Sequence, residues 1–372
     1  MKKNIPALRF PQFADAPEWE IKMLNEVADI NKGTQFNKIL LNETGKYPCL
    51  NGGISPSGYS EKYNCNENTI IISEGGNSCG FVQFMQAKFW CGGHCYAIKI
   101  KKNWIDKYNN LYLYQILKYN ELLIMNLRLG GALPNIQKKD LIKVSLFIPS
   151  LAEQTQIANF FAAVDNRILL LTEKHTQLKL YKKGIMQQIF SQKLRFKDEN
   201  DEYFPDWEIK MLGEVCFKKY SNLAANKIVE NFGNYPVYGA AGLLKHIDFC
   251  KEIEPYIAIV KDGAGIGRLL LCPSNSSVLG TLDVIKHNKN TNLSFLYYTL
   301  STIDFKKYAI GSTIPHVYFS EYKQHKILFP SLAEQEKIGE FLSLIDAQIE
   351  NVGQQVEKMQ LWKRGLLQKM MI

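Results

Sequence analysis

The chain has 372 residues, 46% hydrophobic and 22% charged, a globular mixture that excludes a disordered chain, a collagen and a disulfide miniprotein. Its length favours two domains or one duplicated unit, and its formal net charge of +9 suits a polyanionic partner. Because no apolar run approaches the ~20 residues that span a bilayer and no apolar signal segment follows the N-terminus, we expect a cytoplasmic protein without membrane association whose cysteines stay reduced.

The chain opens with a string that returns in its second half. PEWEIKMLNEV at residues 17–27 returns as PDWEIKMLGEV at 205–215, and LRF precedes each copy. A second string, PSLAEQ at 149–154, returns unchanged at 330–335. Because both strings recur in the same order, the sequence predicts two copies of one unit. We expect bodies over 1–149 and 193–329, and helical regions over 150–192 and 330–372.

Both bodies are expected to mix α and β structure. Short apolar runs bounded by glycine-rich turns predict strands at 69–73 and 256–260. Helix-like stretches at 109–129 and 293–309 each precede a loop with a Gly and Pro frame. The two loops are GGALPN at 130–135 and GSTIPH at 311–316. A weaker similarity aligns EGGN at 74–77 with DGAG at 262–265.

A long helix is predicted after each PSLAEQ string. Ser150 and Ser331 follow a proline and are the expected N-caps, with Glu153 and Glu334 three residues on as capping-box partners. The first helix, at about 1.5 Å per residue, would be roughly 60 Å long.

Apolar residues in these helices recur at alternating spacings of four and three, which predicts the a/d seam of a coiled coil. Such a seam usually belongs to a helix in a bundle core, but two seams at one register favour the two helices packing on each other, antiparallel, with a pseudo-two-fold axis. Lys182 and Lys363 interrupt the seams, where they would snorkel or face the start of the partner helix. The seam residues are Ile157, Phe161, Val164, Ile168, Leu171, Leu178, Ile338, Leu342, Ile345, Ile349, Val352 and Val356.

Positive charge is concentrated in the bodies. The two helical regions together carry a net charge of +1, so the remaining segments carry +8 of the total of +9. A polyanion is therefore expected to bind the bodies, while the helices provide surfaces for protein partners.

The order of these strings resembles the specificity (S) subunit of a type I restriction-modification enzyme, and both helices also end in related strings, KKGIMQ at 182–187 and KRGLLQ at 363–368. The resemblance implies an α+β fold, with two similar mixed α/β target recognition domains separated by an antiparallel coiled coil of two long helices. Each domain would read one half of a split, asymmetric site on double-stranded DNA. The coiled coil would set the half-site spacing.

The resemblance also implies partners. Two methyltransferase (M) subunits, which carry S-adenosylmethionine and methylate adenine, would dock where helices, repeated strings and bodies meet. Restriction (R) subunits would join through the complex and add ATP-driven translocation and cleavage. This chain would then be non-catalytic and bind no cofactor itself, with S-adenosylmethionine, ATP and magnesium on the partner subunits.

The search for catalytic motifs supports a non-catalytic chain. No Pro-Pro pair is present for an amino-methyltransferase loop, and the glycine runs lack the lysine of a P-loop. Pro205 and Asp206 superficially resemble part of a nuclease site, but their string also opens the first copy. Cys91 and Cys95, in CGGHC, could supply zinc ligands; because the second copy lacks them, we favour buried thiols and no metal site.

DNA contacts are expected where the two bodies share a frame but differ in side chains, as base readout requires. For each candidate the alternative is a solvated surface residue. The candidates at the Gly and Pro loops are Asn135, Lys138 and Lys139 in the first body and His316 and Tyr318 in the second. Further candidates are Asn77, Ser78 and Arg128 in the first body and Lys245, His246, Lys261 and Arg268 in the second.

Two other functions compete with DNA recognition. One is a self-contained enzyme, such as a nuclease fused to its own DNA readers, for which DNA cleavage by the purified chain would be required. The other is a coiled-coil scaffold or regulator that binds no DNA, which a gel shift at low salt distinguishes.

Overall fold

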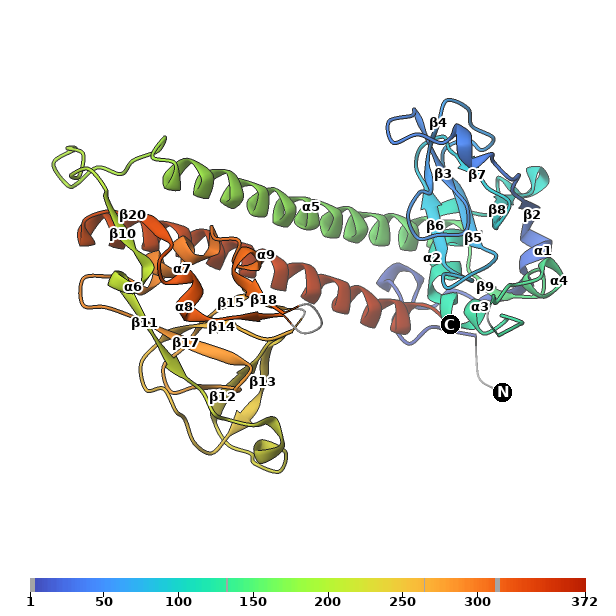
Figure 1. The fold of residues 1–372 in the computed structure, drawn as a ribbon. Coiled ribbons are helices and arrows are strands. Elements are labelled where there is room, and N and C mark those ends of the chain that lie inside the picture. The colour runs from blue at the N-terminus through green and yellow to red at the C-terminus, as the bar shows by residue number, and fades with distance from the viewer. Residues whose placement is uncertain (1–3, 132, 264, 312–314) are drawn as a thin grey trace. The chain divides into compact units, whose positions relative to one another are not determined.

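The structure is a computed structural model that describes residues 4–131, 133–263, 265–311 and 315–372 (Figure 1). Parts of the predicted glycine-rich turn and loops, at residues 132, 264 and 312–314, lie outside the described residues. By its internal contacts the chain divides into two units, the first formed by Met1–Thr172 and Gln354–Ile372, and the second by Glu173–Gly353. Each unit is described separately.

A four-stranded antiparallel sheet forms the centre of each unit, with the order β2-β8-β5-β6 in the first and β11-β17-β14-β15 in the second. The predicted strands at 69–73 and 256–260 are confirmed as β5 and β14, which are buried along their whole length. The strands are β2 (Ala28–Lys32), β5 (Thr69–Ser73), β6 (Val82–Met85), β8 (Cys95–Ile100), β11 (Cys216–Tyr220), β14 (Tyr256–Val260), β15 (Leu269–Cys272) and β17 (Leu282–His287).

Smaller sheets repeat in the same way. A three-stranded sheet has the order β4-β3-β7 in the first unit and β13-β12-β16 in the second, and a strand of each repeated opening string pairs with the strand before the long helix. The second unit also contains the pair β18-β19. These strands are β1 (Glu20–Met23), β3 (Tyr47–Leu50), β4 (Gly58–Ser60), β7 (Trp90–Cys91), β9 (Ser145–Ile148), β10 (Glu208–Met211), β12 (Tyr235–Gly239), β13 (Gly242–Ile247), β16 (Ser277–Val278), β18 (Ala309–Ile310), β19 (His316–Val317) and β20 (Lys326–Phe329).

The helices in the bodies are shorter than predicted. Asn109 and Asn292 cap α2 and α7 by accepting hydrogen bonds from backbone N–H groups, as expected of this residue type. The predicted stretch 109–129 is interrupted at Asn120, and 293–309 ends its α-helical part at Ser301. The helical elements are α1 (Leu24–Val27), α2 (Asn110–Tyr119), α3 (Glu121–Met125), α4 (Lys138–Leu141), α6 (Leu212–Val215), α7 (Leu293–Ser301) and α8 (Phe319–Tyr322), with 3-10 turns η1 (Pro11–Phe13), η2 (Lys38–Leu40), η3 (Lys102–Trp104), η4 (Ala225–Ile228) and η5 (Phe305–Tyr308).

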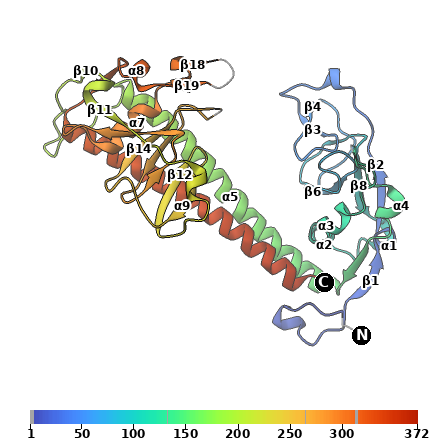
Figure 2. The same cartoon turned by 60° about the horizontal axis from the view of Figure 1, so that its bottom comes forward.

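The two long helices are α5 (Leu151–Phe190) and α9 (Leu332–Met370), and Figures 1 and 2 show them side by side. In the first unit the start of α5 packs on the end of α9; in the second, the start of α9 packs on the end of α5. The predicted antiparallel pairing is therefore confirmed. All the predicted seam residues are buried or half-buried in this structure.

The lysines that interrupt the seams bind aspartates on the facing helix. In the first unit Lys363 Nζ lies 2.6 Å from Asp165 Oδ1, and in the second Lys182 Nζ lies 2.5 Å from Asp346 Oδ1. Each lysine thus has a specific partner rather than snorkelling into solvent. Both pairs are partly exposed, and each fits the observed alignment of the helices, in which lysine and aspartate face one another.

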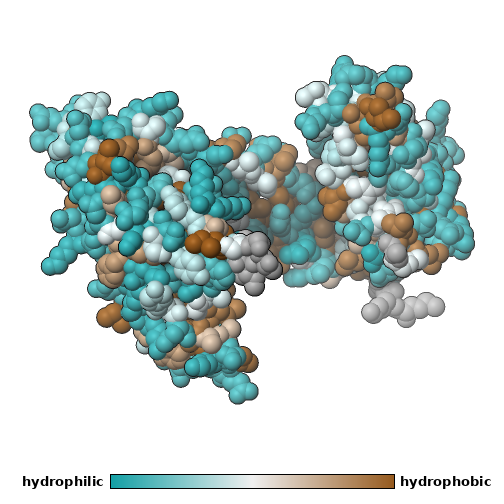
Figure 3. Space-filling model, viewed as in Figure 1, coloured by the Kyte–Doolittle hydropathy of each residue, from teal (hydrophilic) through white to brown (hydrophobic). Residues whose placement is uncertain are grey.

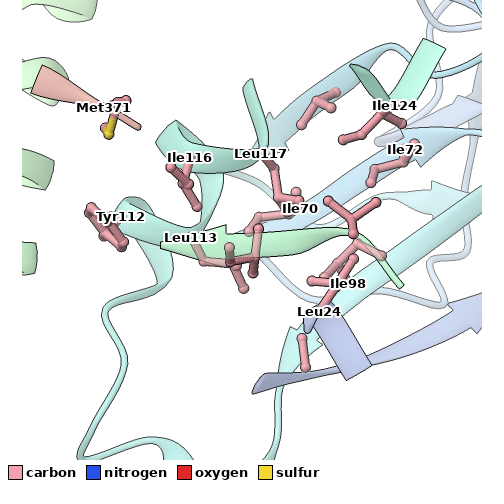
Figure 4. Close-up of a cluster of buried hydrophobic side chains, with 14 of the residues drawn as sticks. Leu24, Ile70, Ile72, Ile98, Tyr112, Leu113, Ile116, Leu117, Ile124 and Met371 are labelled. Carbon is pink, nitrogen blue, oxygen red and sulfur yellow. The ribbon is translucent and has the colours of Figure 1, made fainter. Parts of the chain in front are cut away.

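The main core of each unit lies between its central sheet, its body helices and the long-helix pair. Figure 4 shows side chains from β5, β8 and α2 in the core of the first unit. Met371, which follows the last turn of α9, belongs to that core, and Ile189 from the last turns of α5 belongs to the core of the second unit. Each core is thus completed by the end of a long helix.

Candidate nucleic-acid interface

The repeated strings are joined to one another by buried ion pairs. Arg9 donates two hydrogen bonds of 2.6–2.7 Å to the Glu153 carboxylate, and Arg195 donates two of 2.9–3.0 Å to Glu334. Both glutamates are fully buried. Ser150 caps its helix weakly, at 3.4 Å from Glu153 N, but the predicted capping box is wrong because arginine takes the glutamate side chain. Much of the repetition therefore serves to attach each long helix to its body.

A second group of repeated residues is exposed and apolar. Side chains that recur at matching positions of the opening and PSLAEQ strings are 39–70% exposed, although neither core uses them. The long helices also carry matched exposed apolar side chains, Leu180 and Tyr181 on α5 and Leu361 and Trp362 at the corresponding positions of α9. The matched exposed residues of the strings, which we call the repeated apolar surface, are Ile21, Met23 and Leu151 in the first unit and Ile209, Met211 and Leu332 in the second.

In the first unit, two loops that carry predicted DNA contacts lie against each other. Gly76 N donates a 3.0 Å hydrogen bond to Pro134 O, and Ile136 N donates one of 2.8 Å to Glu74 O. The turn after β5 and the loop before α4 are therefore joined. We call them the loop pair.

The second unit contains the same loop pair. Gly263 N donates a 3.1 Å hydrogen bond to Pro315 O, and Val317 N donates one of 2.9 Å to Lys261 O. These bonds match Glu74 with Lys261 and Gly76 with Gly263, so the alignment of 74–77 with 262–265 is wrong by one residue. The reason is that both turns are glycine-rich; the positive φ of Gly76 (77°) and Gly263 (83°) agrees with the match that the hydrogen bonds give.

The structure brings most first-unit candidates together. Asn77 and Asn135 are exposed on the two members of the loop pair. Arg128 is exposed beside Leu129, which pairs with Asn135 through two backbone hydrogen bonds of 2.9 Å. The Ser78 hydroxyl donates a hydrogen bond to a backbone carbonyl, so this side chain holds the turn. The remaining candidates, Lys138 and Lys139, are exposed at the start of α4.

In the second unit, three candidates meet at the loop pair. His316 Nδ1 lies 2.7 Å from Asp262 Oδ1, and the Tyr318 ring stacks on the His316 ring with centroids 6.1 Å apart. Lys261 Nζ lies 3.2 Å from Asp283 Oδ1, so its charge is paired. The second loop pair thus carries an imidazole, a phenol ring and an ion-paired lysine, whereas the first carries the amides of Asn77 and Asn135.

Three second-unit candidates lie on the smaller sheet or bind it. Lys245 Nζ donates to the carbonyls of Ile228, the last residue of η4, and Val229, at 2.7 and 2.9 Å. Arg268 donates a 2.8 Å hydrogen bond to Ala240 O and thereby ties the β14–β15 turn to the β12–β13 turn. His246 is exposed on β13. The loop pair therefore does not include Lys245 or His246.

Buried carboxylates paired with lysines were missed by the sequence reasoning. Glu74 pairs with Lys32 at 2.8 Å, and Asp283 pairs with Lys218 and Lys261 at 3.4 and 3.2 Å. The sequence signal was weak: Asp283 interrupts an apolar strand, whereas Glu74 stands in an ordinary turn.

Three cysteines of the first body lie in one apolar cluster. Cys65, Cys91 and Cys95 are buried there with Phe89 and Leu50. Over the described part of the chain, no group of three or more His, Cys, Asp or Glu side chains is arranged to hold a metal ion. None of the described helices is long and apolar enough to cross a membrane, and the face shown in Figure 3 is mostly hydrophilic.

These features define the class of protein: a duplicated unit with one frame and two sets of exposed side chains, each unit attached to a long helix. The family described as "Type I restriction modification DNA specificity domain" matches residues 17–180 and 205–358, and the chain belongs to this family.

Known relatives and structures agree with the family. A putative type I specificity subunit of Mycoplasma pneumoniae is 27% identical over 95% of this chain and 96% of its own length. The type I restriction enzyme MjaVIII specificity subunit of Methanocaldococcus jannaschii is 25% identical over 98% of this chain and 93% of its own. The crystal structure of a type I restriction-modification S subunit from M. genitalium has the same fold, with a TM-score of 0.77, 21% identity and 99% of both chains covered.

Proposed function

We propose that this chain is the DNA sequence-specificity subunit of a type I restriction-modification system. Its two target recognition domains bind a bipartite, asymmetric site on double-stranded DNA. The observation that carries this proposal is the loop pair, which has the same backbone hydrogen bonds in both units but different exposed side chains. A constant frame with altered side chains suits two readers of two different half-sites.

The half-sites are proposed to be chemically unlike. The first loop pair presents Asn77 and Asn135, amides that suit the N6 and N7 atoms of adenine, whereas the second presents His316 and Tyr318. An asymmetric DNA site follows from this difference. Phosphate contacts by lysine and arginine would supply much of the affinity and make it fall steeply with salt.

The repeated apolar surface is proposed to dock the methyltransferase (M) subunits, one on each unit. Ile209 is 70% and Ile21 54% exposed, and depletion of charge with enrichment of apolar side chains is typical of interface centres. Because the surface occurs twice at matching positions, it suits two copies of one partner. Restriction (R) subunits would then join through the M subunits.

Catalysis is proposed to reside in the partners, which would bind S-adenosylmethionine, ATP and magnesium, while this chain selects the DNA site in the cytoplasm. The continuous 40-residue α5 and 39-residue α9, joined at one register by their lysine–aspartate pairs, would set the gap between half-sites.

The test is to co-purify the chain with its M subunit and map the methylated adenines. Exchange of residues 25–148 for the corresponding segment of another specificity subunit should change one half of the methylated sequence and leave the other half and the gap unchanged. Methylation at an unaltered site after this exchange would refute the proposal. The substitutions Ile21→Glu and Ile209→Glu together should abolish co-purification of the M subunit while the chain remains folded.

A further inference from the structure

Three positions at one end of the central sheet carry the same three kinds of side chain in both units, but in a different order. They are the last residue of β2 or β11, the residue that follows β5 or β14, and the second residue of β8 or β17. In each sheet the third of these strands lies between the other two. The strand registers match them, because Lys32 faces Tyr96 and Tyr220 faces Asp283. The positions are occupied by Lys32, Glu74 and Tyr96 in the first unit and by Tyr220, Lys261 and Asp283 in the second.

In the first unit the lysine is at the surface. Lys32 Nζ lies 2.8 Å from Glu74 Oε1, and the Tyr96 hydroxyl donates a 2.9 Å hydrogen bond to the same oxygen. The Lys32 side chain is 57% exposed, whereas that of Glu74 is 8% exposed. Burial and the Glu74 carboxylate raise the pKa of Tyr96, so its proton stays in place. Glu74 thus tethers an exposed ammonium group that has further donors available.

In the second unit the aromatic ring is at the surface instead. Tyr220 is 73% exposed, and Lys218 Nζ lies 3.5 Å from its ring centroid. Asp283, almost fully buried, pairs with both Lys218 and Lys261 below the ring. The position that presents a tethered cation in the first unit therefore presents a supported aromatic ring in the second.

This end of the sheet lies away from the parts that the two copies share. β2 begins directly after the opening string, so Ala28 lies at the end near that string and Lys32 lies at the far end. Glu74 also belongs to the loop pair, through its carbonyl bond to Ile136 N. Position 32 in the first unit, and position 220 in the second, therefore adjoins the candidate DNA-reading loops.

We infer that Lys32 and Tyr220 are specificity-determining residues of the two readers, Lys32 by donating to guanine O6 or N7 and Tyr220 by packing its ring on a thymine methyl group. Glu74 is the positioning residue for Lys32. This inference rests on the proposed function and assigns base contacts to it. The chemistry follows from the major-groove edges, where lysine suits guanine acceptors and an apolar surface suits the thymine methyl.

The experiment uses the full chain with its M subunit and selects bound sequences from a randomised duplex DNA pool. Lys32→Met should reduce the preference for guanine at one base pair of the first half-site by about tenfold, the order expected for one lost base contact, with no change in the second half-site. Tyr220→Ala should reduce a thymine preference in the second half-site and leave the first half-site unchanged. Lys102→Met is the matched control, because Lys102 is exposed beyond the opposite end of β8.

The outcomes separate the inference from the proposed function. If the wild-type complex selects no bipartite sequence, both fail. If it selects one, but Lys32→Met lowers affinity equally for all duplexes and, like the control Lys102→Met, leaves the guanine preference unchanged, Lys32 is a phosphate contact and the inference alone fails. Unchanged selection by Lys32→Met or by Tyr220→Ala also overturns it. If Lys32→Met lowers the melting temperature, Lys32→Arg serves as a second variant. It keeps the ion pair with Glu74 and must retain the guanine preference. Tyr220→Ala removes an exposed side chain, so it tests the second reader without removing a buried group.

Discussion

Removal of the arginine that anchors each long helix should destabilise the two units unequally. In the first unit, two hydrogen bonds from Arg9 neutralise the fully buried Glu153 carboxylate. Arg9→Met would leave that carboxylate buried without its charge partner, which typically costs ~3–5 kcal/mol. The indole N–H of Trp19, on the same repeated string, is buried without a hydrogen-bond partner, so it provides no second donor to Glu153.

The second unit differs by one hydrogen bond. Trp207 Nε1 donates to Glu334 Oε2 at 2.9 Å in addition to Arg195. Because a hydrogen bond to a charged group contributes ~1.5–3 kcal/mol, Arg195→Met should cost less than Arg9→Met by about 1.5 kcal/mol or more. Both variants also lose hydrogen bonds to backbone carbonyls, so this loss largely cancels in the comparison.

Urea-dependent hydrogen exchange of amides at 151–160 and 332–341 reports the stability of each unit. Equal losses in the two variants, or a larger loss for Arg195→Met, would refute the reasoning, as would losses below about 1 kcal/mol in both. Glu153→Leu in the Arg9→Met background should recover much of the loss, since apolar packing often replaces a buried ion pair without cost. Failure to recover would assign the loss to packing of the arginine stem.

Three further perturbations test the cores and the helix register. The ion pair between Lys182 and Asp346 should show a coupling free energy of ~0.5–3 kcal/mol in a double-mutant cycle of alanine variants followed by urea unfolding, and additive losses would contradict its role in helix alignment. Burial and nearby Lys307 lower the pKa of His325. The unfolded chain therefore binds the proton more readily, and stability should fall as the pH drops below about 6.5. Thermal denaturation should show that the melting temperature of His325→Gln depends less on pH than that of the wild type. Deletion of residues 371–372 should cost the first unit ~2–5 kcal/mol in the same exchange assay because Met371 is buried in its core, and unchanged exchange would show that Met371 does not stabilise that core.

The duplicated architecture could be predicted from sequence because its signals are long. Two repeated strings and an apolar seam sustained along each helix admit few alternatives, and the strands at 69–73 and 256–260 are unbroken apolar runs between turns. The ends of the helices in the bodies were harder to predict from the sequence. Asn120 breaks the predicted 109–129 stretch through its backbone conformation (φ −83°, ψ 8°), a local choice that apolar periodicity does not encode.

The candidate site was only partly predictable for the same physical reason. Asn135 was predicted because its loop shares a Gly and Pro frame with the loop of the second body, and Asn77 was a further candidate; backbone hydrogen bonds do join the loops of these two residues. The three permuted positions were missed because the glycine-rich turns aligned Glu74 with Asp262 rather than with Lys261. A shift of one residue places an acid opposite an acid and conceals the exchange of charge. Only the hydrogen-bond pattern corrects it.

The duplicated sequence separates into parts with different constraints. A buried ion such as Glu153 tolerates few replacements, because loss of its partner leaves an uncompensated charge, and this explains why Arg9 and Glu153 recur as Arg195 and Glu334. An exposed residue such as Ile21 has no such constraint from folding, and the proposed common binding partner accounts for its recurrence as Ile209. At the sheet end the buried carboxylates Glu74 and Asp283 each keep lysine partners, but the exposed positions of Lys32 and Tyr220 differ between the units. These exposed positions can diverge without disturbing the helix attachment or the repeated apolar surface.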